Sequence, residues 1–167
     1  MEEGKITADQ FRQAVLTGSF ESAVPQDVDD AVGAILVGIS GYKVALLKRL
    51  AEDYDIYMLS NNNPIATAHA RRIFASAGID MDKDFRKCYL SYQMKMLKPS
   101  QEFYKAVMED IALPSENLLF IDDSQKNVDA AIAAGMPAVF YQPGTDMTAL
   151  LADALGEPSL MTEGGLS

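Results

Sequence analysis

Hydrophobic positions along the chain follow two alternating patterns, a helical spacing and short continuous apolar runs. Helical spacing predicts helices at 8–16, from about 25, at 42–54, 65–77, 100–111, 125–134 and 148–155. Apolar runs predict strands at 55–60, 87–92, 118–123 and 137–141. Because strands alternate with helices, we expect an α/β fold with a doubly wound parallel sheet.

The two ends of the chain differ from this pattern. Residues 1–40 contain only predicted helices: Thr7 is expected to cap the first, Gly18 to end it, and Pro25 to open the second. Residues 41–155 hold the alternating elements, and the breaker-rich residues 156–167 are expected to form an irregular tail.

Composition is that of a globular protein, with 49% hydrophobic and 23% charged residues in 167. A net charge of −10 disfavours binding to nucleic acid. The single cysteine, Cys88, lies in a predicted strand and is expected to be a buried thiol. The sequence has no run long enough for a membrane span and no signal-peptide pattern, which predicts a cytoplasmic protein.

Three predicted strand ends carry candidate chemistry, because ligands of such sheets bind beyond the carboxyl ends of the strands. Ser60 and Asn61 follow the first strand and could hold a phosphate oxygen. Lys98 stands before Pro99 and a helix, where an ammonium could neutralise phosphoryl charge. The adjacent Asp122 and Asp123 end an apolar strand and suit magnesium.

Each feature alone also has a plainer explanation. The segment Ser60–Pro64 makes a good turn, Lys98 could be a surface lysine with Lys95 as its rival, and the acids could cap the next helix. Together, the hydroxyl, the lysine and the acid pair suit phosphoryl transfer, which needs charge neutralisation, a metal and a positioned nucleophile.

With these residues the chain resembles the haloacid dehalogenase superfamily of hydrolases, in particular its sugar-phosphatase-like branch with a helical cap. In that family the second motif is an apolar strand ending in Ser or Thr, which Leu59-Ser60-Asn61 matches. The third is a lysine before a helix, which Lys98-Pro99 matches, and the fourth is a strand ending in acids, which Phe120-Ile121-Asp122-Asp123 matches. The resemblance covers about residues 4–150.

The resemblance implies a Rossmann-like core with part of a helical cap at residues 1–40, and hydrolysis of a small phosphorylated metabolite through an aspartyl-phosphate. Ser60 and Asn61 would bind the phosphoryl group, and Ser60 and Lys98 would take part in catalysis. Asp123 would bind Mg²⁺ directly and Asp122 through water.

The family's first motif, an apolar strand ending in Asp-x-Asp whose first aspartate is the nucleophile, has no match in this sequence. The spacing recurs at residues 27–29, 53–55 and 80–82, but none of these follows an apolar strand, so they are expected to be helix ends and solvated turns. In the family this first strand lies between the strands of the second and fourth motifs. Its loss would leave two inner strands without a shared neighbour.

Three explanations remain open: truncation or a misassigned start, which we favour; a homodimer or other partner that donates a strand; and a rearranged sheet. The chain by itself is expected to be inactive. The alternative function is a non-catalytic protein that binds phosphate and magnesium on the same fold. A phospho-accepting receiver domain is disfavoured because its acid pair ends the first strand and its Lys-Pro comes last, whereas here Lys98 precedes Asp122.

Overall fold

The computed structural model describes residues 1–18, 22–34 and 38–161. The chain divides into two compact units, Met1–Leu97 and Lys98–Ser167, and each is described by itself. No helix in the described ranges is both long enough and apolar enough to cross a membrane.

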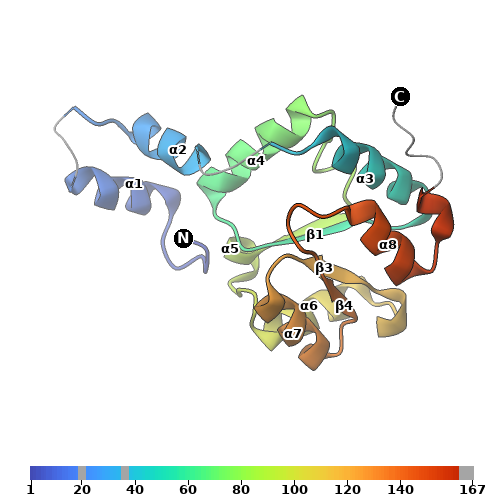
Figure 1. Cartoon of the computed structure of the whole chain (residues 1–167). Coiled ribbons are helices and arrows are strands. Elements are labelled where there is room, and N and C mark those ends of the chain that lie inside the picture. The colour runs from blue at the N-terminus through green and yellow to red at the C-terminus, as the bar shows by residue number, and fades with distance from the viewer. Residues whose placement is uncertain (19–21, 35–37, 162–167) are drawn as a thin grey trace. The chain divides into compact units, whose positions relative to one another are not determined.

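The predicted elements are present with small shifts in their bounds (Figure 1). The helices of the first unit are α1 (Ala8–Thr17), α2 (Pro25–Gly33), α3 (Gly41–Asp53), α4 (Pro64–Ser76) and α5 (Ser91–Met94). The second unit has α6 (Gln101–Ile111), α7 (Gln125–Ala134), α8 (Met147–Leu155) and the short 3-10 helices η1 (Ser115–Asn117) and η2 (Pro158–Met161). The strands are β1 (Tyr57–Ser60), β2 (Lys87–Leu90), β3 (Phe120–Asp122) and β4 (Ala138–Phe140).

In the first unit, β1 and β2 form a parallel pair whose register runs from Tyr57 opposite Lys87 to Ser60 opposite Leu90. Beside this pair lies an apolar cluster built on three buried residues, Ile79, Met81 and Phe85. The rings of Phe74 and Phe85 meet edge to face with centroids 5.9 Å apart. Cys88 on β2 is half-buried against this cluster, and burial raises the pKa of its thiol.

The hairpin of α1 and α2 begins with the predicted cap. The Thr7 hydroxyl accepts from the Gln10 N–H, and the Gln10 side chain accepts from the Thr7 N–H. The other end of the hairpin packs on α4 (Figure 1). There Gly33 lies against the ring of His69. A Cβ on Gly33 would lie 2.1 Å from the His69 ring, so a larger residue would require that ring to move.

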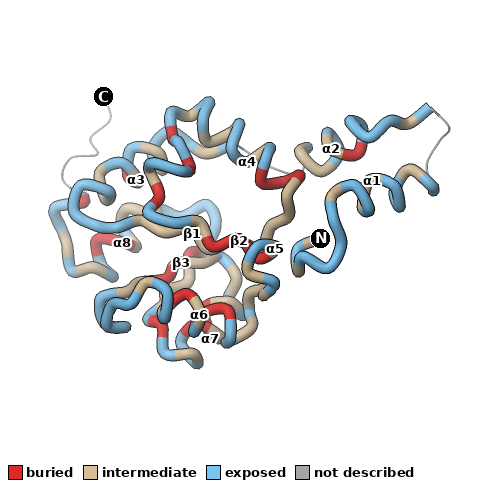
Figure 2. Tube along the Cα trace, turned by 180° about the vertical axis from the view of Figure 1, so that it is seen from behind, coloured by how far each residue is buried: buried red, intermediate tan, exposed pale blue. Residues whose placement is uncertain are grey.

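In the second unit, α6 and α7 pack together and α7 contacts both strands of the parallel β3–β4 pair. The largest buried side chains of the second unit lie on one face of α6, where Phe103, Tyr104 and Val107 are fully buried. Figure 2 shows buried backbone positions along α6. The ring of Tyr104 meets Phe103 at 5.7 Å and Phe120 of β3 at 5.5 Å between centroids. This aromatic core packs the first residue of β3 against α6.

The predicted parallel pairing is confirmed. Each described strand is shorter than predicted, and each sheet has two strands. Among the described residues, β1 pairs with β2 and β3 pairs with β4, in two separate sheets. The strand expected at 87–92 ends at Leu90, because Ser91 begins the short helix α5. In the expected irregular tail, Pro158–Met161 forms η2, and residues 162–167 lie outside the described residues.

Candidate functional site

The turn after β1 carries the first group of expected site residues. Ser60 is the last residue of β1, and Asn61 after it is exposed. The backbone of Asn62 is held on both sides by one side chain, because its N–H donates to Ser91 Oγ at 2.9 Å and its carbonyl accepts from the same hydroxyl at 3.0 Å. The Asn63 side chain then accepts from the Ala66 N–H at 3.0 Å and caps α4. This turn is therefore tied at its far end to the first residue of α5 and to α4.

Lys98 and Asp122 form a buried ion pair in the second unit. Lys98 Nζ lies 2.6 Å from Asp122 Oδ2, and the two side chains are only 9% and 7% exposed. The other carboxylate oxygen accepts from the Ser124 N–H at 2.8 Å and from Asn127 Nδ2 at 2.9 Å. Lys98 Nζ also lies 5.3 Å from the centroid of the Phe120 ring. An ammonium held this firmly at a strand end is suited to neutralise an anion beside it.

A second layer of hydrogen bonds, from Tyr104 and Asn127, supports the Lys98–Asp122 pair. The Tyr104 hydroxyl donates to the Asn127 carbonyl at 3.0 Å, and the Asn127 side chain donates to Asp122. Burial, with a smaller contribution from the charge of Asp122, raises the pKa of Tyr104 well above its usual range, so this hydroxyl stays a donor. The sequence had given Tyr104 no functional role, because an aromatic side chain on the apolar face of a helix is typical of a core.

The two adjacent acids occupy different environments. Both carboxylate oxygens of Asp122 accept hydrogen bonds, which come from Lys98, Ser124 and Asn127. Asp123 is exposed, and among the described residues its carboxylate makes no hydrogen bond or ion pair. The rival lysine, Lys95, is exposed and lies in the first unit at the end of α5.

The donor set at this strand end fits magnesium on its chemistry. In the described ranges no three His, Cys, Asp or Glu side chains gather as a metal cluster. Mg²⁺ nevertheless keeps several waters and needs only one or two protein carboxylates beside a phosphate. Asp123 can supply one of these, whereas Asp122 is already engaged by a lysine.

The structure brings Lys98, Asp122 and Asn127 together within the second unit. Ser60 and Asn61 belong to the first unit. That these residues and Asp123 surround one phosphate group stays a prediction.

The bare Asp-x-Asp spacings occupy the local structures that the sequence predicted. Those at residues 27–29 lie in α2, Asp53 ends α3, and those at 80–82 lie in a turn. Two of these acids form ion pairs with arginines: Asp29 with Arg12 at 2.7 Å, and Asp82 with Arg71 at 2.6 Å. None of the three spacings follows an apolar strand.

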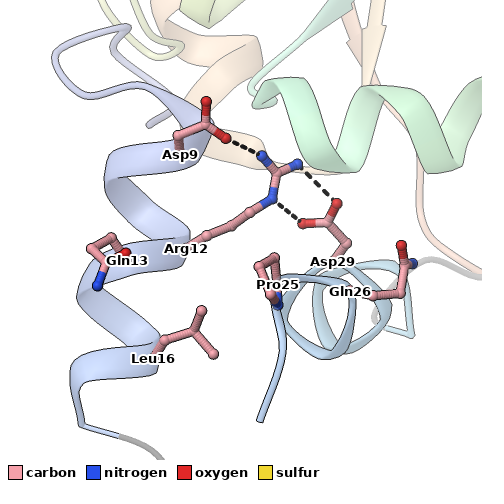
Figure 3. A pocket seen from close by; sticks show the side chains of 7 residues that line it. All are labelled: Asp9, Arg12, Gln13, Leu16, Pro25, Gln26 and Asp29. Carbon is pink, nitrogen blue, oxygen red and sulfur yellow. Dashed lines mark hydrogen bonds and ion pairs between the residues drawn. The ribbon is translucent and has the colours of Figure 1, made fainter.

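A separate hollow of about 280 Å³ lies between α1 and α2 (Figure 3). Figure 3 shows Arg12 reaching from α1 to Asp29 on α2, with both guanidinium edges occupied. Its hydrogen bonds run from Nε and Nη2 to the carboxylate of Asp29, at 2.7 and 2.8 Å, and from Nη1 to Asp9 at 2.7 Å. The guanidinium is thus neutralised by the protein's own acids, and the hollow is not suited to an anion.

The sequence and the fold of this chain match those of known proteins. The family model for a haloacid dehalogenase-like hydrolase matches residues 15–135. The chain belongs to this family. A HAD family enzyme from Bacteroides thetaiotaomicron, crystallised as the wild-type protein with magnesium and inorganic phosphate, superposes with a TM-score of 0.83 at 35% identity, over 89% of this chain and 76% of that one.

Other relatives vary in how much of their length is matched. A predicted HAD-like family hydrolase from Porphyromonas gingivalis gives a TM-score of 0.82 at 29% identity, over 92% of this chain and 76% of that one. D-ribitol-5-phosphate phosphatase of Bacteroides thetaiotaomicron is 29% identical over 148 residues, 87% of this chain and 71% of that protein. Drimenol cyclase drtB of Aspergillus calidoustus is 32% identical over 75 residues, 45% of this chain, which spans only 14% of that protein.

Proposed function

We propose that this chain is the larger part of a magnesium-dependent phosphatase of a small phosphorylated sugar or sugar alcohol. The buried Lys98–Asp122 pair, with the exposed Asp123 beside it at the end of β3, carries the proposal. The chain's membership of the haloacid dehalogenase-like family supports a phosphoryl site at these residues. A relative that acts on D-ribitol 5-phosphate supports the substrate class.

Each residue has a role that follows from its surroundings. Ser60 and Asn61 would hold phosphoryl oxygens at the end of β1. Lys98 would neutralise charge on the phosphoryl group and on its attacking carboxylate, and Asp122 would hold the ammonium in place. Asp123 would bind Mg²⁺, which supplies further charge neutralisation at the phosphate.

The nucleophile would come from an apolar strand ending in Asp-x-Asp, which these 167 residues do not contain. We infer that a strand of this kind completes the doubly wound core. The inference is supported by the pairing of the described strands, in which β1 pairs only with β2 and β3 only with β4. Residues 1–40 would then be part of the helical cap, and residues 41–155 the core.

The experiment compares phosphatase activity of the 167-residue chain with that of a version extended before Met1 by such a strand. We expect no turnover of D-ribitol 5-phosphate by the chain alone and Mg²⁺-dependent turnover by the extended protein. In the extended protein, Lys98→Met should lower kcat by about a hundredfold or more, because transition-state charge loses its partner. A control extension with both aspartates changed to asparagine should be inactive. Turnover that survives Lys98→Met combined with Asp123→Asn would rule out the assignment.

The second candidate is a protein that binds phosphate and Mg²⁺ without turnover. It is favoured by one observation, the lack of an apolar strand ending in Asp-x-Asp within this sequence. Calorimetric binding of inorganic phosphate, with no hydrolysis in the presence of the extension strand, would select this candidate.

A further inference from the structure

Ser91 is a fully buried polar residue that has no part in the phosphatase function proposed above. It is 0% exposed and begins α5 directly after β2. Its hydroxyl accepts from the Asn62 N–H at 2.9 Å and donates to the Asn62 carbonyl at 3.0 Å. A hydroxyl can do both at once because it carries one donor and two acceptor positions.

The location of this contact connects it to the turn after β1. The β1–β2 ladder ends where Ser60 lies opposite Leu90, so Ser91 is the first residue beyond the ladder. Its side chain continues the cross-strand bonding for one more step, to a backbone two residues past Ser60. The turn is then fixed again within one residue, because Asn63 N–H donates to Asn62 Oδ1 and Asn63 caps α4.

We propose that Ser91 is a positioning residue that fixes the path of the Ser60–Asn63 turn, so that the groups of Ser60 and Asn61 stay where a phosphate oxygen is bound. The inference rests on the phosphate-binding role proposed for these two residues. Its physical basis is that a bound anion needs donors held in advance, since donors that must be ordered on binding lose affinity to the entropy of ordering. Ser91 would touch neither phosphate nor metal.

A change of Ser91 to alanine isolates this effect. The substitution removes only the hydroxyl, adds no atom to a buried site, and leaves the N–H and carbonyl of Asn62 without their side-chain partner. Two controls match it within the same unit. Thr67→Val removes a buried hydroxyl that has no hydrogen-bond partner among the described residues. Ile79→Val shortens a buried side chain of the apolar cluster. It lowers the stability of the unit without changing the turn, and so controls for general destabilisation by Ser91→Ala.

The test measures affinity for inorganic phosphate in the presence of Mg²⁺ by calorimetry, and exchange of the Asn62 amide hydrogen by NMR. We expect Ser91→Ala to weaken phosphate binding by about tenfold, the equivalent of one supported hydrogen bond. The Asn62 amide should exchange faster in that variant. Thr67→Val and Ile79→Val should keep the affinity of the unchanged chain, and Ser60→Ala should lose it.

The outcomes separate this inference from the function it rests on. If Ser60→Ala loses phosphate and Ser91→Ala binds it like the unchanged chain, the role of Ser91 is overturned and the phosphate site stands. An equal loss of affinity in Ile79→Val would also overturn it, because general destabilisation would then explain the result. If the chain extended by the Asp-x-Asp strand also binds no phosphate, the proposed function fails and the positioning role fails with it.

Discussion

Two ion pairs of nearly the same length serve different regions of this molecule. Lys98 and Asp122 approach to 2.6 Å in the second unit, and Arg12 and Asp29 approach to 2.7 Å on the α1–α2 hairpin. Their side chains differ in exposure, at 9% and 7% for the first pair and 24% and 22% for the second. The first pair also has an aromatic ring and two further hydrogen-bond donors around it.

The difference shows that the surroundings of a pair, not its length, decide its role. A buried pair interacts in a low dielectric, and removing one member leaves an uncompensated charge. An exposed pair is screened by water and salt, and it contributes little by itself. The Arg12–Asp29 pair contributes to the packing of α1 on α2 because α1 has no buried residue. Polar contacts are therefore prominent in holding α1 to α2.

The largest expected effect comes from breaking the buried pair. Asp122→Ala should destabilise the protein by about 3–5 kcal/mol, because the Lys98 ammonium is left buried without its counter-charge. Asp122→Asn should cost less, because an amide oxygen still accepts from Ser124 and Asn127. Urea unfolding measures each free energy.

The neighbouring acid provides the control for this prediction. Asp123→Ala removes an exposed carboxylate and should change the free energy of unfolding by less than about 0.5 kcal/mol. Equal stability of the Asp122 and Asp123 variants would contradict the contrast between the two acids.

Most of the fold could be predicted from the sequence because its signals are local. The Thr7 capping box, the Pro25 helix start and the apolar faces of the helices depend on residues three or four positions apart. The strand ends with their acids and lysine were found for the same reason. The short helix α5 was missed, because Ser91 and Tyr92 continue an apolar-aromatic run that favours a strand.

The support of the candidate site could not be predicted in this way. The Tyr104 hydroxyl bonds a carbonyl 23 residues away, and the Ser91 hydroxyl bonds a backbone 29 residues away. Neither partner is marked by residue type, because every residue has a carbonyl and only the fold decides which one is near. Which of two adjacent acids meets Lys98 likewise depends on three-dimensional packing.

An intermediate effect is expected from the second layer of hydrogen bonds around the buried pair. Tyr104→Phe keeps the aromatic packing against Phe103 and Phe120 but leaves the Asn127 carbonyl without this donor. We expect a loss of about 1 kcal/mol in the free energy of unfolding. Phe103→Leu, which changes packing and no hydrogen bond, is the matched variant for a double-mutant cycle with Asn127→Ala. Asn127→Ala keeps the carbonyl that accepts from Tyr104 and removes only the side-chain bond to Asp122. If the hydroxyl supports the pair by holding Asn127 in place, only the Tyr104 change should couple to Asn127→Ala, and absence of this coupling would show that the hydroxyl does not support the pair.

The smallest effect is expected at the less buried pair, Arg12–Asp29, and it depends on pH. The hydrogen bonds from Arg12 lower the pKa of Asp29, and the charges of His69 and Arg72 add to this shift. Since the folded-state pKa lies below that of the unfolded chain, the pair stabilises the hairpin above the usual aspartate pKa of about 4. This stabilisation is lost as pH falls through the lowered pKa, because a protonated Asp29 no longer attracts Arg12.

Hydrogen exchange read by mass spectrometry can follow this loss in α1 alone. Protection of residues 8–17 should fall between pH 5 and pH 3 by more than the protection of α6 in the same sample, after correction for the intrinsic pH dependence of exchange. In Arg12→Ala, α1 should be less protected at pH 5, and this extra acid sensitivity should disappear. Arg71→Ala removes a more exposed pair of the same two-hydrogen-bond geometry, with Asp82 elsewhere in the unit, and should leave α1 unchanged. If α1 in Arg12→Ala keeps the acid sensitivity of the unchanged chain, a group other than Asp29 holds the hairpin together.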